Sequence, residues 1–242
     1  MSNMKSLIDR FFISAGFAAA LALGGCTDDG SSAEGEAATD GHDDHGHDDH
    51  GHDDHGHDHG ETEIITTVTL TFTPQGGGDP VTAAFSDPDG DGGMSGSADP
   101  ITLAAGTTYD MTVAFTNELV DPAEDITAEI EEEAEDHQLF VTGDAVDGPA
   151  TGSADAALVT HAYADVESDY GSNDVGDDLP VGLANTIEAT TAGTGTFSVR
   201  LQHLPESNGT PVKTAGLAEA LAMDEALPGD VDVSVSFDLT VE

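Results

Sequence analysis

The feature that most constrains the fold is a strict alternation of apolar and polar residues near the C-terminal end. In DVDVSVSFDLTVE every second residue is apolar, namely Val231, Val233, Val235, Phe237, Leu239 and Val241. A two-residue period places successive side chains on opposite faces of a strand, so it predicts a half-buried β-strand. The same period occurs in EIITTVTLTFT, TTYDMTVAFTN and GTFSVRLQHL, and shorter candidates are VTAAFS, ALVTHAYA and GLANTIEAT.

Turns rich in Gly, Pro and Asp separate these runs, and strands do not alternate regularly with helices. We therefore predict a mainly β domain over residues 63–242, a single antiparallel sandwich of the immunoglobulin-like type. Residues 122–138 and 214–227 each contain good helix formers with Ile or Leu four residues apart. These two segments predict one or two short helices.

Residues 1–25 have the pattern of a lipoprotein signal peptide. Basic residues precede the apolar stretch 11–25, which is too short for a membrane-spanning helix, since such a helix needs about twenty residues. Small residues then lead to Cys26, the single cysteine of the chain. We expect cleavage before Cys26 and lipidation of its sulfur, which anchors the protein to a membrane without a span. Acidic residues follow directly and favour a lipid-anchored position on the outer membrane, at its periplasmic face or at the cell surface.

Residues 26–62 predict a disordered tether, because they contain no aromatic or branched aliphatic side chain to bury. Within the tether, Gly-His-Asp-Asp-His occurs three times in succession. The histidines of this repeat are His42, His45, His47, His50, His52, His55, His57 and His59. Neutral imidazole is a good ligand for zinc, copper or nickel, and aspartate adds negative charge. The repeat therefore predicts metal capture; the alternative is a solvated spacer lengthened by repetition.

The charge of the chain is extreme, with four Lys and Arg against 49 Asp and Glu and a formal net charge of −45. Such a surface repels nucleic acid and anionic lipid headgroups, so neither is expected as a partner. Cations are the natural partners. Adaptation to salt predicts the same composition, so the charge by itself does not locate a site.

Two further groups could bind metal ions within residues 63–242. Asp87, Asp89 and Asp91 match the opening of an Asp-x-Asp-x-Asp-Gly calcium loop, although its twelfth position, Ala98, is not a glutamate. The alternative for this loop is a simple turn. The other group is His137, His161 and His203, which would form a second metal site if the fold brings them together; otherwise they are surface or structural histidines.

Catalytic motifs are missing from the sequence, which contains no Gly-x-Ser-x-Gly, no His-Glu-x-x-His and no phosphate-binding loop. We therefore expect a protein that is not an enzyme. The stretches LAAGTTYDMTVAFTNE, EDITAEIEEEAEDHQLFV and TFSVRLQHLP resemble small bacterial lipoproteins labelled type 1 periplasmic binding fold superfamily proteins. That resemblance implies a role in uptake together with a TonB-dependent outer-membrane receptor, and the His/Asp-rich tether is an addition to the family pattern.

Two functions from different classes follow from these observations. The first is a lipid-anchored binding protein that captures zinc, or a related transition metal, through its tether and delivers it to a receptor. The second is a receptor-associated or adhesive interaction domain that calcium stabilises, with the tether as a spacer.

Overall fold

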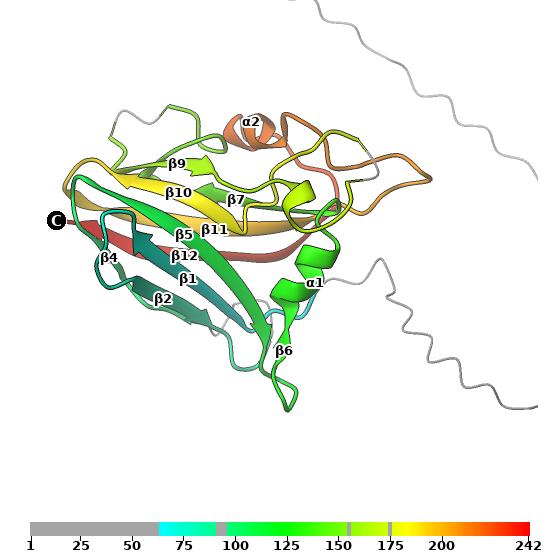
Figure 1. The fold of residues 1–242 in the computed structure, drawn as a ribbon, viewed down its shortest axis with the longest axis horizontal. Coiled ribbons are helices and arrows are strands. Elements are labelled where there is room, and N and C mark those ends of the chain that lie inside the picture. Colours follow the sequence, from blue (N-terminus) through cyan, green and yellow to red (C-terminus); the bar gives the residue numbers. More distant parts are fainter. Residues whose placement is uncertain (1–62, 91–95, 154–155, 174–175) are drawn as a thin grey trace, which may run out of the picture. The chain divides into compact units, whose positions relative to one another are not determined.

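The computed structural model describes residues 63–90, 96–153, 156–173 and 176–242, and most of their regular structure is β-strand (Figure 1). The larger sheet contains β1 (Thr67–Pro74), β2 (Val81–Ser86), β3 (Ser97–Ala98), β5 (Thr107–Asn117), β6 (Glu124–Asp125), β8 (Val146–Asp147), β9 (Val159–Tyr163) and β10 (Ala184–Ala189). The smaller sheet contains β4 (Ile101–Leu103), β7 (His137–Thr142), β11 (Gly193–His203) and β12 (Asp230–Val241). The prediction of a mainly β domain is confirmed.

The strand order is β3-β2-β1-β5-β10-β9-β8 in the larger sheet, with β6 paired to β5, and β4-β12-β11-β7 in the smaller sheet. Most neighbours are antiparallel, but β4 runs parallel to β12 and β8 runs parallel to β9. Both sheets are therefore mixed, and the larger one curls into a half-barrel. A single antiparallel immunoglobulin-like sandwich is not confirmed.

The core lies between the two sheets. On β1 the side chains of Val68, Leu70 and Phe72 are fully buried, while the threonines between them face away from the core, as the two-residue period predicts. The rings of Phe72 and Phe197 meet edge to face with their centroids 5.8 Å apart, which joins β1 of one sheet to β11 of the other. Each large apolar side chain buried in this way contributes about 1.5–3 kcal/mol to folding.

Two helices complete the described regular structure, apart from a short 3-10 turn, η1 (Glu167–Asp169). Helix α1 (Ile126–Glu132) buries Ile126 and Ile130 in the main core, and it leads directly towards β7. Helix α2 (Leu217–Ala222) lies against Phe140 of β7 and forms part of a smaller apolar cluster. Both predicted helices are present but shorter than predicted. None of the described helices is long and apolar enough to cross a membrane.

The pairing of β11 with β12 contains an irregularity that the sequence pattern did not predict. Leu201 pairs with Val233, but the next residue, Gln202, pairs with Val231, so Asp232 has no partner and forms a β-bulge. A bulge breaks the alternation of faces and re-aims the side chain at that position. The prediction that all the apolar residues of this run share one buried face is therefore wrong at Val231, a residue that is 41% exposed.

Candidate metal centre

Two of the predicted histidines meet at one end of the smaller sheet. His137 begins β7 and His203 ends β11, and the two are direct partners in the antiparallel pairing of these strands. Their rings are stacked, with centroids 4.6 Å apart and planes 4° apart, and both residues are buried. The next inward-facing pair on the same strands is Leu139 and Leu201, so the histidines extend the core layer towards its end.

Glu133 adds a carboxylate to this pair. It follows the last residue of α1 and lies four residues before His137, with the chain turning between them. Glu133, His137 and His203 each offer one ligand atom, and these atoms all lie within 4.8 Å of one another. Ligands of a tetrahedral zinc ion lie about 3.4 Å apart, given bonds of about 2.0–2.1 Å. Small movements of these side chains would therefore close them around an ion.

The hydrogen bonding of His137 leaves one ring nitrogen ready for a metal. Its Nδ1 lies 3.2 Å from the backbone carbonyl of Glu133, and because a carbonyl only accepts, Nδ1 carries the hydrogen. Burial, together with the neighbouring His203, lowers the pKa of His137 to about 4, so the ring is neutral at pH 7. Its Nε2 then presents a lone pair, and metal-binding histidines are oriented by such a bond to the other nitrogen.

That lone pair faces a carboxylate. Nε2 of His137 lies 3.7 Å from Oδ2 of Asp232, and neither side chain has any exposed area. His137 Nε2 and both carboxylate oxygens of Asp232 are buried without a well-formed hydrogen bond. A buried polar group left unsatisfied costs about 1–3 kcal/mol, so two acceptors facing each other need a cation between them.

A proton is the simplest such cation, and a metal ion is the other. Burial, then Asp230 and Glu133, raise the pKa of Asp232 to about 7, although the nearby Glu63 backbone amide lowers it. The 3.7 Å separation is longer than a hydrogen bond, so a shared proton fits this geometry poorly. A metal ion with bonds of about 2 Å to each atom fits between atoms at this distance.

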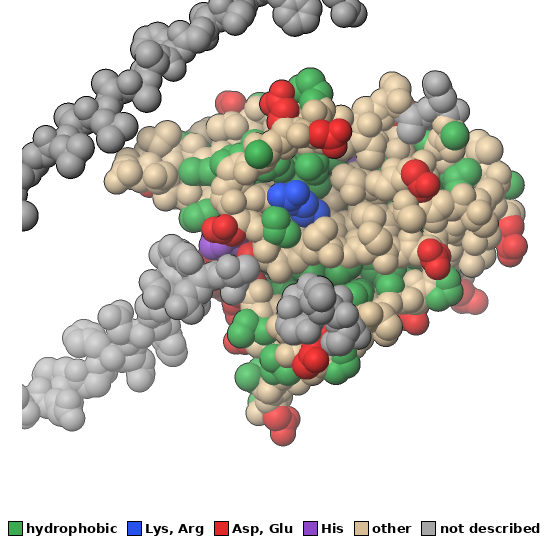
Figure 2. Space-filling model, turned by 180° about the vertical axis from the view of Figure 1, so that it is seen from behind, with side chains coloured by type: hydrophobic (Ala, Val, Ile, Leu, Met, Phe, Trp, Pro, Cys, Tyr) green, Lys and Arg blue, Asp and Glu red, His purple; other side chains and the backbone are tan. Residues whose placement is uncertain are grey.

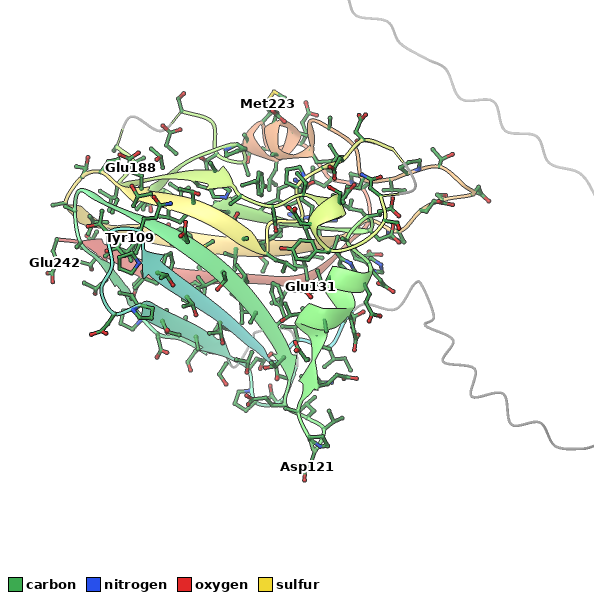
Figure 3. All side chains as sticks on the ribbon, in the orientation of Figure 1. Tyr109, Asp121, Glu131, Glu188, Met223 and Glu242 are labelled. Carbon is green, nitrogen blue, oxygen red and sulfur yellow. The ribbon has the colours of Figure 1, made fainter. Side chains whose placement is uncertain are left out.

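The donor set suits the predicted cofactors. Two imidazoles with one or two carboxylates are typical of zinc, and copper and nickel also accept imidazole. Glu133 also lines a hollow of about 230 Å³ at the surface. Its other walls are Glu131, Glu132, Ala134, Glu135, Asp136, Glu167, Gly171 and Ser172. Carboxylates crowd this end of the molecule around α1, where Glu131 is labelled (Figure 3), and they concentrate cations near the centre.

The predicted trio needs a correction, because His161 is not part of this group. His161 lies on β9 of the larger sheet, opposite Ile187 of β10. Its Nε2 is 2.9 Å from Oδ1 of Asn185, and its ring lies edge-on to Tyr163. Asn185 therefore holds this histidine in a structural position, whereas Asp232, from the bulge of β12, joins His137 instead.

The other predicted site residues are placed differently or lie outside the described residues. Asp87 is buried and its carbonyl accepts a turn hydrogen bond from Gly90, whereas Asp89 is exposed and Asp91 is not described. This arrangement is that of a turn, and among the described residues no metal-binding group includes Asp87 or Asp89. Cys26 and the eight histidines of the repeat also lie outside the described residues.

Two ligand candidates were missed at the level of sequence. The first is Glu133, which lies four residues after Glu129 and four residues before His137. That spacing places side chains along one side of a helix, so it is the signal that could have identified Glu133. Asp232 gave no signal, because the bulge that re-aims it depends on how β12 pairs with β11.

Comparison with known proteins adds no relatives. No protein-family model matches the chain, no curated protein is similar to it, and no solved structure shares its fold detectably. The family resemblance seen in the sequence stays a prediction.

Proposed function

We propose that the protein is a lipid-anchored outer-membrane or cell-surface binding protein that captures zinc or a related transition metal. The tether gathers ions through its repeated histidines, and the centre formed by Glu133, His137, His203 and Asp232 holds one ion more tightly. Delivery to a TonB-dependent receptor is the role that this arrangement suits. The proposal also includes an immunoglobulin-like sandwich as the architecture of the domain.

One observation carries the proposal, namely the buried lone pair of His137 facing the buried carboxylate of Asp232 without a donor between them. A domain that only needed a stable core gains nothing from this contact, which costs folding free energy when no cation is present. The stacked partner, His203, and the carboxylate of Glu133 each have a ligand atom within 4.8 Å of one on His137, and they supply the remaining ligands of the proposed centre.

Zinc titration by calorimetry tests both parts of the proposal. Three proteins are compared: the full chain, a deletion of residues 41–60, and a double variant with His137→Ala and His203→Ala. The deletion should keep one tight site and lose the weaker sites. The double variant should lose the tight site and keep the weaker ones, because the repeat is untouched.

Two outcomes would contradict the proposal, each for a different part. Equal stoichiometry in the full chain and the deletion would remove the tether from the function. A deletion variant that binds no zinc would remove the centre. Circular dichroism of each variant shows whether the domain is still folded.

A further inference from the structure

A lysine, a glutamate and an asparagine meet at a second polar cluster, whose residues are not ligands of the histidine centre. Nζ of Lys213 lies 2.8 Å from Oε1 of Glu167, and neither of these two side chains is more than 3% exposed. The other oxygen of Glu167, Oε2, accepts a hydrogen bond of 2.9 Å from Nδ2 of Asn173. One carboxylate therefore holds an amine on one oxygen and a carboxamide on the other.

The three side chains come from different segments, and each segment is held in place. Glu167 begins η1, Asn173 follows this turn, and Lys213 lies in the loop between β11 and α2. Nζ of Lys213 also donates to the carbonyl of Ala134, 2.8 Å away, which fixes this loop to the turn after α1. Nδ2 of Asn173 donates a second, longer hydrogen bond of 3.4 Å to Oδ1 of Asp178. The amine and the carboxamide are thus positioned by several partners and not by Glu167 alone.

The buried lysine is chemically unusual in this chain, where basic residues are rare. Lys213 and Arg200 are the only Lys or Arg among the described residues, and Figure 2 shows blue confined to a small area of that face. Burying an ion pair costs desolvation free energy that often exceeds the attraction between the two charges. Burial lowers the pKa of the Lys213 ammonium, although Glu167 and Asp165 act in the opposite direction. Transfer of a proton to Glu167 leaves a neutral amine, which is the nucleophilic form.

We propose that Lys213 and Asn173 form an isopeptide bond within the chain, with Glu167 as the proton carrier. Nζ of Lys213 attacks the side-chain carbonyl carbon of Asn173; a C–N bond to Nζ forms, and the bond from that carbon to Nδ2 breaks. Glu167 takes two protons from the ammonium at Oε1 and passes one of them to Nδ2 from Oε2, so ammonia leaves. Both buried charges disappear, because Glu167 ends protonated beside a neutral amide.

This bond gives the domain a covalent brace that needs no metal ion, so it does not depend on the proposed function. It joins the segment after η1 to the loop between β11 and α2, and its two residues, Asn173 and Lys213, are 40 positions apart. The chain has one cysteine and therefore cannot form a disulfide within itself. A cross-link between distant positions stabilises a fold chiefly by restricting the unfolded chain.

Intact mass spectrometry of the full chain tests the proposal. After allowance for the substitution itself, the unmodified chain should be lighter than Asn173→Ala by one ammonia molecule. Lys213→Arg keeps the positive charge and Glu167→Gln keeps the shape of the side chain, and both should retain the ammonia. Asn208→Ala is the matched control, because Asn208 precedes Gly209 in the same loop as Lys213, and an Asn-Gly pair can lose ammonia by forming a succinimide. This control should remain cross-linked.

Trypsin digestion of the denatured chain locates the bond. After residue 10, Arg200 and Lys213 are the only Lys or Arg in the sequence, and trypsin does not cut after a lysine whose amine is acylated. The unmodified chain should be cut after Arg200 but not after Lys213, and the two fragments should stay joined. Asn173→Ala should be cut at both positions and should separate into fragments.

An unmodified chain that keeps its full mass and is cut after Lys213 would overturn the proposal. A loss of ammonia that persists in Lys213→Arg, or that disappears in Asn208→Ala, would also overturn it, because the reaction would then lie elsewhere. A Glu167→Gln chain that is folded by circular dichroism and still cross-links would remove Glu167 as the proton carrier.

Discussion

The structure contains two buried histidine environments that look alike at first and differ in what surrounds them. At His137 and at His161, one ring nitrogen has a hydrogen-bond partner and the other is buried without one. The free nitrogen of His137 faces Asp232 and shares its surroundings with His203 and Glu133. Among the described residues, no group of three possible metal ligands includes His161.

The difference shows that burial of an imidazole does not by itself indicate a metal site. Burial lowers the pKa of both rings and keeps them neutral, which any metal-binding histidine requires. Among the described residues, only His137 has both a carboxylate 3.7 Å from its unpartnered nitrogen and a metal-binding group around it. The predictions below test whether that convergence separates a metal centre from a structural histidine.

The largest expected effect comes from removing His203. In a full chain whose eight repeat histidines are changed to asparagine, here called the repeat-silent chain, His203→Ala should weaken zinc binding by more than about 100-fold. Even loss of a residue behind a ligand costs about 10–100-fold. His161→Asn is the matched control and should leave zinc affinity unchanged. Competition with a chromophoric chelator measures both affinities. Equal losses in the two variants would show that the histidine environments do not differ in function.

Asp232→Asn should affect metal binding and stability in opposite directions. The amide cannot replace the carboxylate charge, so zinc affinity should fall about tenfold or more. Without metal the amide N–H can donate to Nε2 of His137, which removes the facing pair of acceptors. The metal-free variant should therefore be more stable than the unmodified chain by about 1–3 kcal/mol above pH 7.

The pH dependence of this gain follows from the pKa of Asp232. Its folded pKa, about 7, lies above the unfolded value, so the folded chain binds more protons between about pH 4 and pH 7. The stability that protonated Asp232 contributes is complete below about pH 4 and is lost as the pH rises to about 7. Thermal unfolding of both proteins in a chelator should show a difference that grows over this range. A constant difference would contradict the raised pKa.

Glu133→Gln should have a smaller effect on the centre. Glutamine keeps an oxygen ligand but loses the negative charge, so zinc affinity should fall by about tenfold. Glu131→Gln makes the same change of charge on the exposed surface of α1 and should leave the affinity within about twofold of the unmodified value. Equal losses in both variants would indicate that diffuse surface charge, and not a ligand, controls zinc binding.

The smallest effect on zinc affinity is expected from a change at Asn185, the hydrogen-bond partner of His161. Asn185→Ala removes the partner of His161 Nε2 and leaves a second buried nitrogen unsatisfied, so it should destabilise the fold by about 1–3 kcal/mol. Zinc affinity should not change. Thermal unfolding and the same chelator competition provide the two readings, and a fall in affinity would connect His161 to the centre after all.

The sequence predicted the strands well because their signal is local. The alternation in β1 and the apolar residues at the end of β12 reappear as buried side chains. The meeting of His137 with His203 depends on the pairing of β7 with β11, strands whose facing histidines are far apart in the chain. The sequence therefore predicted these residues as candidates but wrongly added His161, whose position follows from its pairing in the other sheet.

The alternation of apolar and polar residues could not identify Asp232 as a ligand for a related reason. Val231, Asp232 and Val233 read as regular alternation whether or not the strand contains a bulge, and only the shift of register against Leu201 and Gln202 reveals it. The same bulge exposes Val231, which the pattern placed in the core. The parallel pairings of β4 and β8 likewise depend on contacts between distant segments.

A crystal structure of the repeat-silent chain soaked with zinc would test the central claim most directly. We expect an anomalous zinc peak bonded to Nε2 of His137, to a ring nitrogen of His203 and to carboxylate oxygens of Glu133 and Asp232, with no zinc at His161. A zinc-soaked crystal in which the two rings remain stacked with no ion between His137 and Asp232 would contradict it.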